Sequence, residues 1–217
     1  MQIDTIVLGD FQTNCYCVRK DEKSRQCLII DPGLEAEPLV QMLNHNEYSP
    51  VDILLTHGHA DHIGGVETLR ENWPDVKVTI HKDDASMLTS PTRNLSLMAG
   101  YMVQTQPADE LLNSENSFYT SVGLRFRLLN TPGHTPGGIC LYDASEQVLF
   151  AGDTLFAGSI GRTDFPGGNT SQLLEMIREK ILILPDATKI YPGHGPATTV
   201  KQEKDFNPFV SAGASGL

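Results

Sequence analysis

The sequence predicts an α/β protein in which mixed β-sheets carry their helices on the outside. Short apolar segments typical of strands precede segments typical of helices in both halves of the chain. This repeated order favours one pseudo-repeated domain over residues 1–217 rather than two independent domains. The helical pattern is clearest at 170–184, where Leu173, Ile177 and Ile181 recur at helical spacing.

The first half of the chain alternates strands and helices. Its predicted strands are rich in Ile, Val and Leu and bounded by turn residues, and they lie at 3–9, 15–20, 26–33, 51–57 and 76–81. Helices are predicted at 35–46 and 65–72 because apolar residues there share one face. Residues 82–117 show no clear period, so only short helical pieces are expected.

The second half repeats the same pattern. Its predicted strands lie at 124–134, 137–143, 148–153 and 187–195. Thr170 is the predicted N-cap of the helix at 170–184. A short helical piece is expected within 200–210, followed by a small, polar tail at 211–217.

Composition excludes several classes of function. The 27 acidic side chains outnumber the 16 basic ones, and the net charge of -11 argues against a nucleic acid or an anionic membrane as the main partner. Four cysteines form no CxxC pair and no disulfide framework. The N-terminus lacks the basic start of a signal peptide, and no apolar run approaches the ~20 residues that span a bilayer. We expect a cytoplasmic protein with reduced thiols.

The candidate chemistry begins in a loop after the predicted strand 51–57. The run Thr56-His57-Gly58-His59-Ala60-Asp61-His62 places four potential metal ligands within six residues. Imidazole and carboxylate groups are the usual ligands of divalent first-row metals. His57 and His59 are expected on one side of the loop, and Asp61 and His62 at a distance that suits a neighbouring metal. The alternative is a polar loop whose histidines gather by chance.

Three later residues share similar surroundings. His134 in TPGHTPG, Asp153 in AGDTL and His194 in YPGHGP each follow an apolar strand and lie beside Gly, Thr or Pro. Taken singly, each could be an ordinary surface residue. Together with the first loop they make five histidines and two aspartates, which suffices for two metals if one aspartate bridges them. His45 and His81 are expected to be structural or exposed.

These motifs, in this order, resemble the metallo-β-lactamase superfamily, from about Asp31 to His194. The resemblance implies a four-layer αββα sandwich of two mixed sheets flanked by helices. It also implies a division of the ligands between two metals: His57, His59 and His134 on the first, Asp61, His62 and His194 on the second, and Asp153 on both. Asp31, in IIDPG, matches an aspartate that supports the site from behind the ligands; its alternative is a turn-forming Asp-Pro-Gly.

The stretch GDTLFAGSIGRTDFPGG at 152–168 resembles the glyoxalase II branch, particularly its short bacterial members. The sequence Gly-Arg-Thr-Asp within it also resembles persulfide dioxygenases, which use one iron. Arg162 falls where longer glyoxalase II enzymes place a glutathione-binding lysine, while their nearby tyrosine is absent. Arg162 is therefore a candidate carboxylate contact for substrate, and an ion pair with Asp164 is the alternative.

Only residues 195–217 follow His194, so we expect no C-terminal helical substrate-binding domain of the kind that longer glyoxalase II enzymes carry. Lys204 is a second candidate contact for substrate, and an exposed helix lysine is the alternative. Without that domain, tight selectivity for glutathione is in doubt. The expected partner is a small-molecule thioester, such as a glutathione conjugate.

The resemblance implies a binuclear hydrolase with two divalent metal ions per chain. Zinc is the first expectation, and iron and manganese also suit these ligands. Asp61 and Asp153 are the predicted catalytic carboxylates, and the predicted reaction is hydrolysis of a thioester such as an S-2-hydroxyacylglutathione by a bridging hydroxide. A thiolate, with a conjugate-acid pKa of ~8.5, leaves without much proton donation.

Three alternatives stay open. A persulfide dioxygenase would hold one iron(II) on His57, His59 and Asp153. Another hydrolase of the superfamily, such as a lactonase, an esterase or a β-lactamase, would use the same ligands. A metal-binding protein without turnover belongs to a different class.

Overall fold

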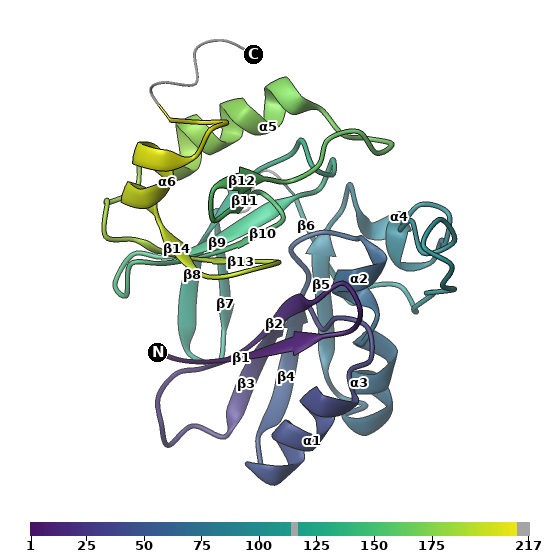
Figure 1. Ribbon diagram of the computed structural model, residues 1–217. Helices are drawn as coiled ribbons and strands as arrows, with labels where there is room; N and C mark the ends of the chain where they lie inside the picture. The colour runs from purple at the N-terminus through teal and green to yellow at the C-terminus, as the bar shows by residue number, and fades with distance from the viewer. Residues whose placement is uncertain (114–116, 212–217) are drawn as a thin grey trace. The chain divides into compact units, whose positions relative to one another are not determined.

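The computed structural model describes residues 1–113 and 117–211 and divides into two compact units (Figure 1). The first unit comprises Met1–Asn113 with Thr120–Arg125, and the second comprises Ser114–Tyr119 with Phe126–Leu217. The described residues form two six-stranded sheets, one within the first unit and the other mostly within the second. The grouping of both units into a single domain stays a prediction.

The first sheet is mixed. Its strands run in sequence order: β1 (Gln2–Leu8), β2 (Thr13–Arg19), β3 (Gln26–Ile30), β4 (Ser49–Leu54), β5 (Lys77–His81) and β6 (Glu110–Leu112). The pairs β1–β2 and β2–β3 are antiparallel, whereas β3–β4, β4–β5 and β5–β6 are parallel. Parallel neighbours end at the same edge of the sheet, so the loops after β3, β4 and β5 emerge together.

Helices cover one face of this sheet (Figure 1). They are α1 (Glu37–His45), α2 (Ala60–Ile63), α3 (Val66–Asn72) and α4 (Ala85–Leu88). Leu39 and Leu43 of α1 pack with Leu69 of α3 in one apolar cluster that also contains strand residues. Cys17 and Val18 are adjacent on β2 and both fully buried. Successive side chains of a strand point to opposite faces, so these two side chains belong to different faces of the sheet.

The second sheet is also mixed, in the order β14-β13-β10-β9-β8-β7. Its strands are β7 (Phe118–Ser121), β8 (Leu124–Asn130), β9 (Ile139–Asp143), β10 (Val148–Gly152), β13 (Lys189–Pro192) and β14 (Thr198–Thr199). The pair β10–β13 is parallel, and β8–β9, β9–β10 and β13–β14 are antiparallel. A separate two-stranded ribbon joins β11 (Leu155–Phe156) to β12 (Ser159–Ile160).

A long helical segment packs on the second sheet. It begins as α5 (Thr170–Met176) and continues as the π-helical turn η1 (Ile177–Ile181), and α6 (Val200–Phe206) follows β14. Leu173, Ile177 and Ile181 are fully buried in the second apolar cluster. The N-cap of α5 is Asn169, whose side chain accepts a hydrogen bond from the Gln172 N–H. The prediction of Thr170 as the N-cap was therefore wrong by one residue.

The predicted fold class is confirmed, because the chain forms two mixed sheets with helices packed on them. Most predicted strands and helices lie within a few residues of the observed bounds. The structure ends the strand predicted at 124–134 at Asn130, since residues 131–134 turn away as a loop. Among residues 1–113 and 117–211, no helix has the length and apolar character that crossing a bilayer requires.

Candidate metal centre

The first group of candidate ligands lies in the first unit, in the loop after β4 and at the start of α2. We call His57, His59, Asp61 and His62 the first half-site. Asp61 and His62 lie on α2, and His59 is its N-cap residue, with extended backbone. All three histidines are buried, and the Asp61 side chain is 19% exposed. A buried set of imidazoles beside a carboxylate is a donor set that divalent first-row metals favour.

Asp31 lies behind this half-site, directly after β3, the parallel neighbour of β4. Its Oδ1 accepts a hydrogen bond from the Thr56 N–H at 2.8 Å, and its Oδ2 accepts one from the Thr56 hydroxyl at 2.6 Å. The same Oδ2 lies 2.9 Å from Nδ1 of His62. Asp31 has a φ of 52°, a conformation that Asp tolerates better than most residues.

These contacts determine how two imidazoles are oriented. A carboxylate only accepts, so His62 carries its proton on Nδ1. The Thr56 hydroxyl gives its one proton to Asp31 and therefore accepts from Nδ1 of His57, at 3.1 Å. Both rings thus keep the lone pair on Nε2 for a metal, which is the usual arrangement for histidine ligands. Nε2 of His62 lies 3.5 Å from Oδ2 of Asp61.

The second group of candidate ligands lies in the second unit. We call His134, Asp153 and His194 the second half-site. Asp153 follows β10 and His194 follows shortly after β13, its parallel neighbour. His134 follows β8, which runs in the same direction as β10 because β9 is antiparallel to both. Three strands that point the same way therefore bring these side chains to one edge of the sheet.

Distances within the second half-site match those between ligands of one cation. Oδ2 of Asp153 lies 3.6 Å from Nε2 of His134 and 3.5 Å from Nε2 of His194. Two ligands at ~2.0–2.2 Å from a tetrahedral cation lie about 3.4 Å apart, whereas a charge-assisted hydrogen bond is shorter, at ~2.7–2.9 Å. The spacing and the chemistry of the donors therefore fit a metal, with the carboxylate between two imidazoles.

The Gly-Arg-Thr-Asp motif supports His134 through its backbone. The Arg162 carbonyl accepts a hydrogen bond from Nδ1 of His134 at 2.7 Å, which leaves the Nε2 lone pair facing Asp153. A side chain at Gly161 would collide with the Asp153 carbonyl and press on Cβ of His134. Glycine is needed there because the backbone passes so close to both residues. Sequence reasoning concentrated on the Arg162 side chain and missed this role of the main chain.

Both cations predicted to contact substrate are engaged in ion pairs. The Arg162 guanidinium binds Asp164 with two contacts, of 3.0 and 2.7 Å, and lies over the Phe165 ring. This pair lowers the pKa of Asp164 and raises the pKa of Arg162. Lys204 of α6 lies 2.6 Å from Asp186, which lowers the pKa of that carboxyl. The ion-pair alternative for Arg162 is present in the structure, and its contact with substrate stays a prediction.

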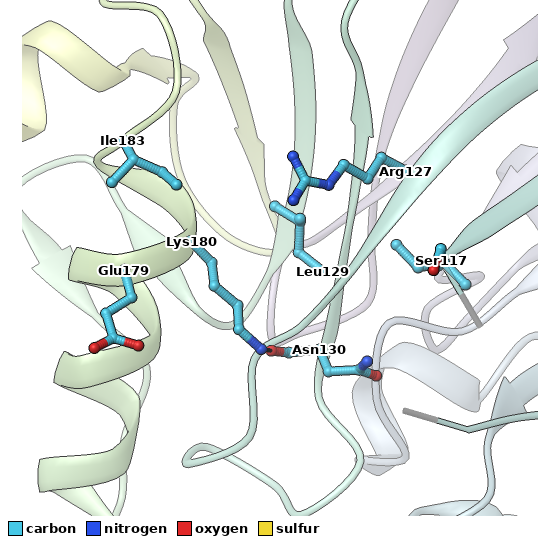
Figure 2. Close-up of a pocket in the computed structure, with 8 residues that line it drawn as sticks. Ser117, Arg127, Leu129, Asn130, Glu179, Lys180 and Ile183 are labelled. Atoms are coloured by element: carbon cyan, nitrogen blue, oxygen red, sulfur yellow. Dashed lines mark hydrogen bonds between the residues drawn. The ribbon is translucent and has the colours of Figure 1, made fainter. Parts of the chain in front are cut away.

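A cavity of about 220 Å³ lies elsewhere in the second unit, where β8 meets η1 (Figure 2). Arg127 and Leu129 line it from β8, and Lys180 and Ile183 line it from the helical side. Lys180 reaches across to donate a hydrogen bond to the Asn130 carbonyl at 2.6 Å. This contact secures the end of β8, just before the loop that carries His134. None of the lining residues is a predicted ligand.

The structure thus gathers the seven predicted ligands into two groups, four in the first unit and three in the second. Asp31 contacts the first group, as expected of a supporting residue, and its role in metal binding stays a prediction. Sequence reasoning missed Thr56, although it stands directly before the first histidine of the motif. Its hydroxyl group contacts both Asp31 and Nδ1 of His57 and so links the two. His45 is exposed and His81 is buried.

A family model described as metallo-beta-lactamase superfamily matches residues 8–194, a range that includes both half-sites. A probable metallo-hydrolase, YqgX of Bacillus subtilis, is 40% identical over 94% of this chain and 95% of its own length. The hydroxyacylglutathione hydrolase GloC of Haemophilus influenzae is 37% identical, over 98% of this chain and 99% of its own.

Three solved structures share the fold. The BLEG-1 B3 metallo-beta-lactamase superposes with a TM-score of 0.91 at 40% identity, covering 97% of this chain and all of the other. TTHA1623, in a di-iron-bound form, has a TM-score of 0.83 at 35% identity, over 95% of this chain and all of the other. ETHE1 from Myxococcus xanthus has a TM-score of 0.76 at 31% identity, over 97% of this chain and 85% of the other.

Proposed function

Because this chain belongs to the metallo-β-lactamase superfamily, we propose that it is a metal-dependent hydrolase of small-molecule thioesters. The observation that carries the proposal is the position of Asp153, whose Oδ2 lies 3.5–3.6 Å from the Nε2 atoms of two histidines. A carboxylate placed between two imidazoles is suited to share a cation with each of them. Similarity to a hydroxyacylglutathione hydrolase over nearly the whole chain supports the choice of substrate.

The proposal assigns the ligands as the family resemblance implies. In it, His57, His59 and His134 would hold one divalent metal, Asp61, His62 and His194 would hold a second, and Asp153 would serve both. Two such cations lower the pKa of a shared water toward neutrality and polarise a carbonyl oxygen. Zinc is the metal we propose, although a similar protein has been solved with two irons.

The side chains of this protein have their own tasks in the reaction. His57 and His62 present Nε2 because Thr56 and Asp31 engage their Nδ1 atoms. The Thr13 hydroxyl lies 3.5 Å from Oδ2 of Asp61 and helps to fix that carboxylate. Asp61 and Asp153 are the catalytic carboxylates in the proposal, since their oxygens accept hydrogen bonds from the attacking water and orient it.

A thioester is favoured over an amide on chemical grounds. A thiolate leaves with a conjugate-acid pKa of ~8.5 and needs little protonation, whereas an amine must be protonated as it leaves. The residues assigned here are ligands and their supports, and none is assigned as a proton donor to the leaving group. We therefore propose S-2-hydroxyacylglutathione or a related 2-hydroxyacyl thioester as the substrate.

The direct test is hydrolysis by zinc-loaded protein of S-lactoylglutathione and of a lactoyl thioester of a small neutral thiol. We expect both to be cleaved. The His59→Ala variant, which removes one proposed ligand, is the matched control and should lose turnover while keeping the fold. Turnover of His59→Ala within tenfold of wild type would remove His59 from the site. If the protein cleaves a lactone or a β-lactam but neither thioester, its substrates belong to that class and the thioester proposal is wrong.

A second candidate function is oxidation of a persulfide with a single iron. The observation that favours it is the Gly-Arg-Thr-Asp stretch at 161–164, which resembles persulfide dioxygenases. In that case His57, His59 and Asp153 would hold the iron. Oxygen consumption by iron-loaded protein with glutathione persulfide, and no cleavage of thioesters, would decide for this function.

A further inference from the structure

Asp84 is a fully buried aspartate that none of the assignments above uses. It occupies the N-cap position of α4, immediately after the loop that follows β5. An aspartate at this position normally accepts a hydrogen bond from its own helix. The Asp84 side chain makes no such capping bond. Its Oδ2 instead accepts a hydrogen bond from the Gly58 N–H at 3.1 Å.

Gly58 is the residue between two of the proposed ligands, His57 and His59. The direction of its N–H fixes the peptide plane that joins it to His57, and this plane helps to set where both imidazoles lie. A Cβ on Gly58 would lie 2.6 Å from Cβ of Met87 on α4. The loop therefore packs directly against α4, and the two cannot shift independently.

A second contact comes from the segment that follows α4. The Asn94 carbonyl accepts a hydrogen bond from the Ala60 N–H, the first residue of α2, at 2.9 Å. The Asn94 side chain is fully buried and donates hydrogen bonds to the carbonyls of Met87 and Val103, both at 2.9 Å. The N–H groups of Gly58 and Ala60 are thus held by Asp84 and by Asn94. These two residues are connected through α4, because Asn94 binds the Met87 carbonyl.

We propose that Asp84 is a positioning residue for metal binding, and that its carboxylate holds the Gly58 N–H so that His57 and His59 are set for their metal before it arrives. This inference rests on the proposed metal-dependent function. Residues that orient ligands from outside the coordination shell typically change metal affinity by about 10–100-fold when mutated. Asp84 should belong to that group because its carboxylate accepts the hydrogen bond of the Gly58 N–H, between the two histidines.

The test compares zinc release to a chromophoric chelator from wild type and from variants at Asp84. Asp84→Ala removes the acceptor and should release zinc at least about tenfold faster. Asp84→Asn keeps an acceptor oxygen and should stay close to wild type. Asp83→Ala changes the neighbouring aspartate, whose side chain is half exposed, and should also behave as wild type. If Asp84→Ala does not fold, Asp84→Ser replaces it, since serine caps a helix but is too short to reach Gly58.

Hydrogen exchange of the Gly58 amide in metal-free protein gives a second readout, and it should be faster in Asp84→Ala than in Asp84→Asn. Wild-type zinc release from the alanine variant overturns the inference, and so does equally fast release from the alanine and asparagine variants. Wild type that holds zinc and cleaves no thioester defeats the proposed function alone. If wild type cleaves thioesters and the Asp84→Ala variant releases zinc as slowly as wild type, only the inference about Asp84 is wrong.

Discussion

Asp31 and His62 form a buried pair in which the carboxylate Oδ2 lies 2.9 Å from the imidazole Nδ1, with side chains only 2% and 0% exposed. The pair connects the end of β3 to α2 and selects which nitrogen of His62 keeps its lone pair. Because the same carboxylate also binds Thr56, it influences His57 as well. One aspartate thus orients two proposed ligands.

Asp31→Asn should weaken metal binding while the fold is kept. Its oxygen can still accept from the Thr56 N–H, but its amide would face Nδ1 of His62 as a donor and favour the other tautomer. We expect zinc affinity to fall about 10–100-fold in a chelator competition. Asp143→Asn, the same change at a buried aspartate that binds its own turn, is the control. Unchanged affinity in Asp31→Asn would show that Asp31 does not orient the ligand.

Asp153→Ala should be more damaging than His194→Ala. Asp153 is proposed to touch both metals, and its loss leaves the repulsion between two cations without an intervening negative charge. Elemental analysis should find metal reduced at both sites in Asp153→Ala, with about one ion retained per chain in His194→Ala. Equal metal content in the two variants would mean that Asp153 does not bridge.

Arg162→Ala should raise KM for a glutathione thioester and leave KM for a thioester of a neutral thiol unchanged. The expectation is that Arg162 contacts a glutathione carboxylate by exchanging it for Asp164. The Asp164→Ala variant distinguishes a substrate contact of Arg162 from a structural role. It removes the ion-pair partner of Arg162, so the guanidinium is available to substrate and KM for the glutathione thioester should fall. The pKa of Asp164 is lowered from its ordinary value of 3.8. The ion pair is therefore fully formed above pH 3.8 and is lost only as the pH falls below that value. The effect should therefore not vary between pH 6 and 8. Parallel increases in KM in both variants would assign the pair a purely structural role.

The four cysteines should be unreactive in the folded protein. All four are free and fully buried. Burial raises the pKa of Cys15 and Cys140 above the ordinary value of 9.0, and a hydrogen bond with Cys17, followed by burial, raises that of Cys27. A thiol reagent should detect none of them in native protein and four in denaturant. Rapid reaction of any thiol in native protein would contradict this.

The raised pKa values of Cys15, Cys27 and Cys140 make stability depend on pH. A thiol whose pKa is raised in the folded state stabilises that state fully below the unfolded value and progressively less as the pH rises above it. The free energy of unfolding should therefore decline above about pH 9, as measured by denaturant titration at a series of pH values. A free energy that stays constant from pH 8 to 11 would contradict the burial of these groups.

Sequence patterns predicted the longer strands well, and with them the loops that carry the candidate ligands, because each loop follows a short apolar strand and is marked by Gly or Pro. The short strands β6, β7, β11, β12 and β14 were not predicted. For the segment 82–117 the patterns predicted only short helical pieces; of its described residues, α4 fits that expectation, and β6 was not predicted. Asp84 and Asn94 act there through contacts with a loop some 26 and 34 residues earlier, and local patterns carry no such information. The π-helical turn at Ile177–Ile181 also went unpredicted, since its apolar residues keep ordinary helical spacing.

Arg162 shows most clearly what a local sequence motif does not predict. The family resemblance drew attention to its side chain, which the structure pairs with Asp164. Its carbonyl, which every residue type has, is the group that contacts His134. Side-chain identity cannot reveal a contact made by the main chain. The signal available in the sequence was Gly161, because a glycine beside candidate ligands often marks a close approach of the backbone.

The central claim is that two metals per chain support thioester hydrolysis. It is tested most directly by titrating metal-free protein with zinc while hydrolysis of S-lactoylglutathione is followed on the same sample. We predict no hydrolysis without metal and a rate that reaches its plateau at two zinc ions per chain. A plateau at one ion per chain, or no hydrolysis at any zinc content, would contradict it.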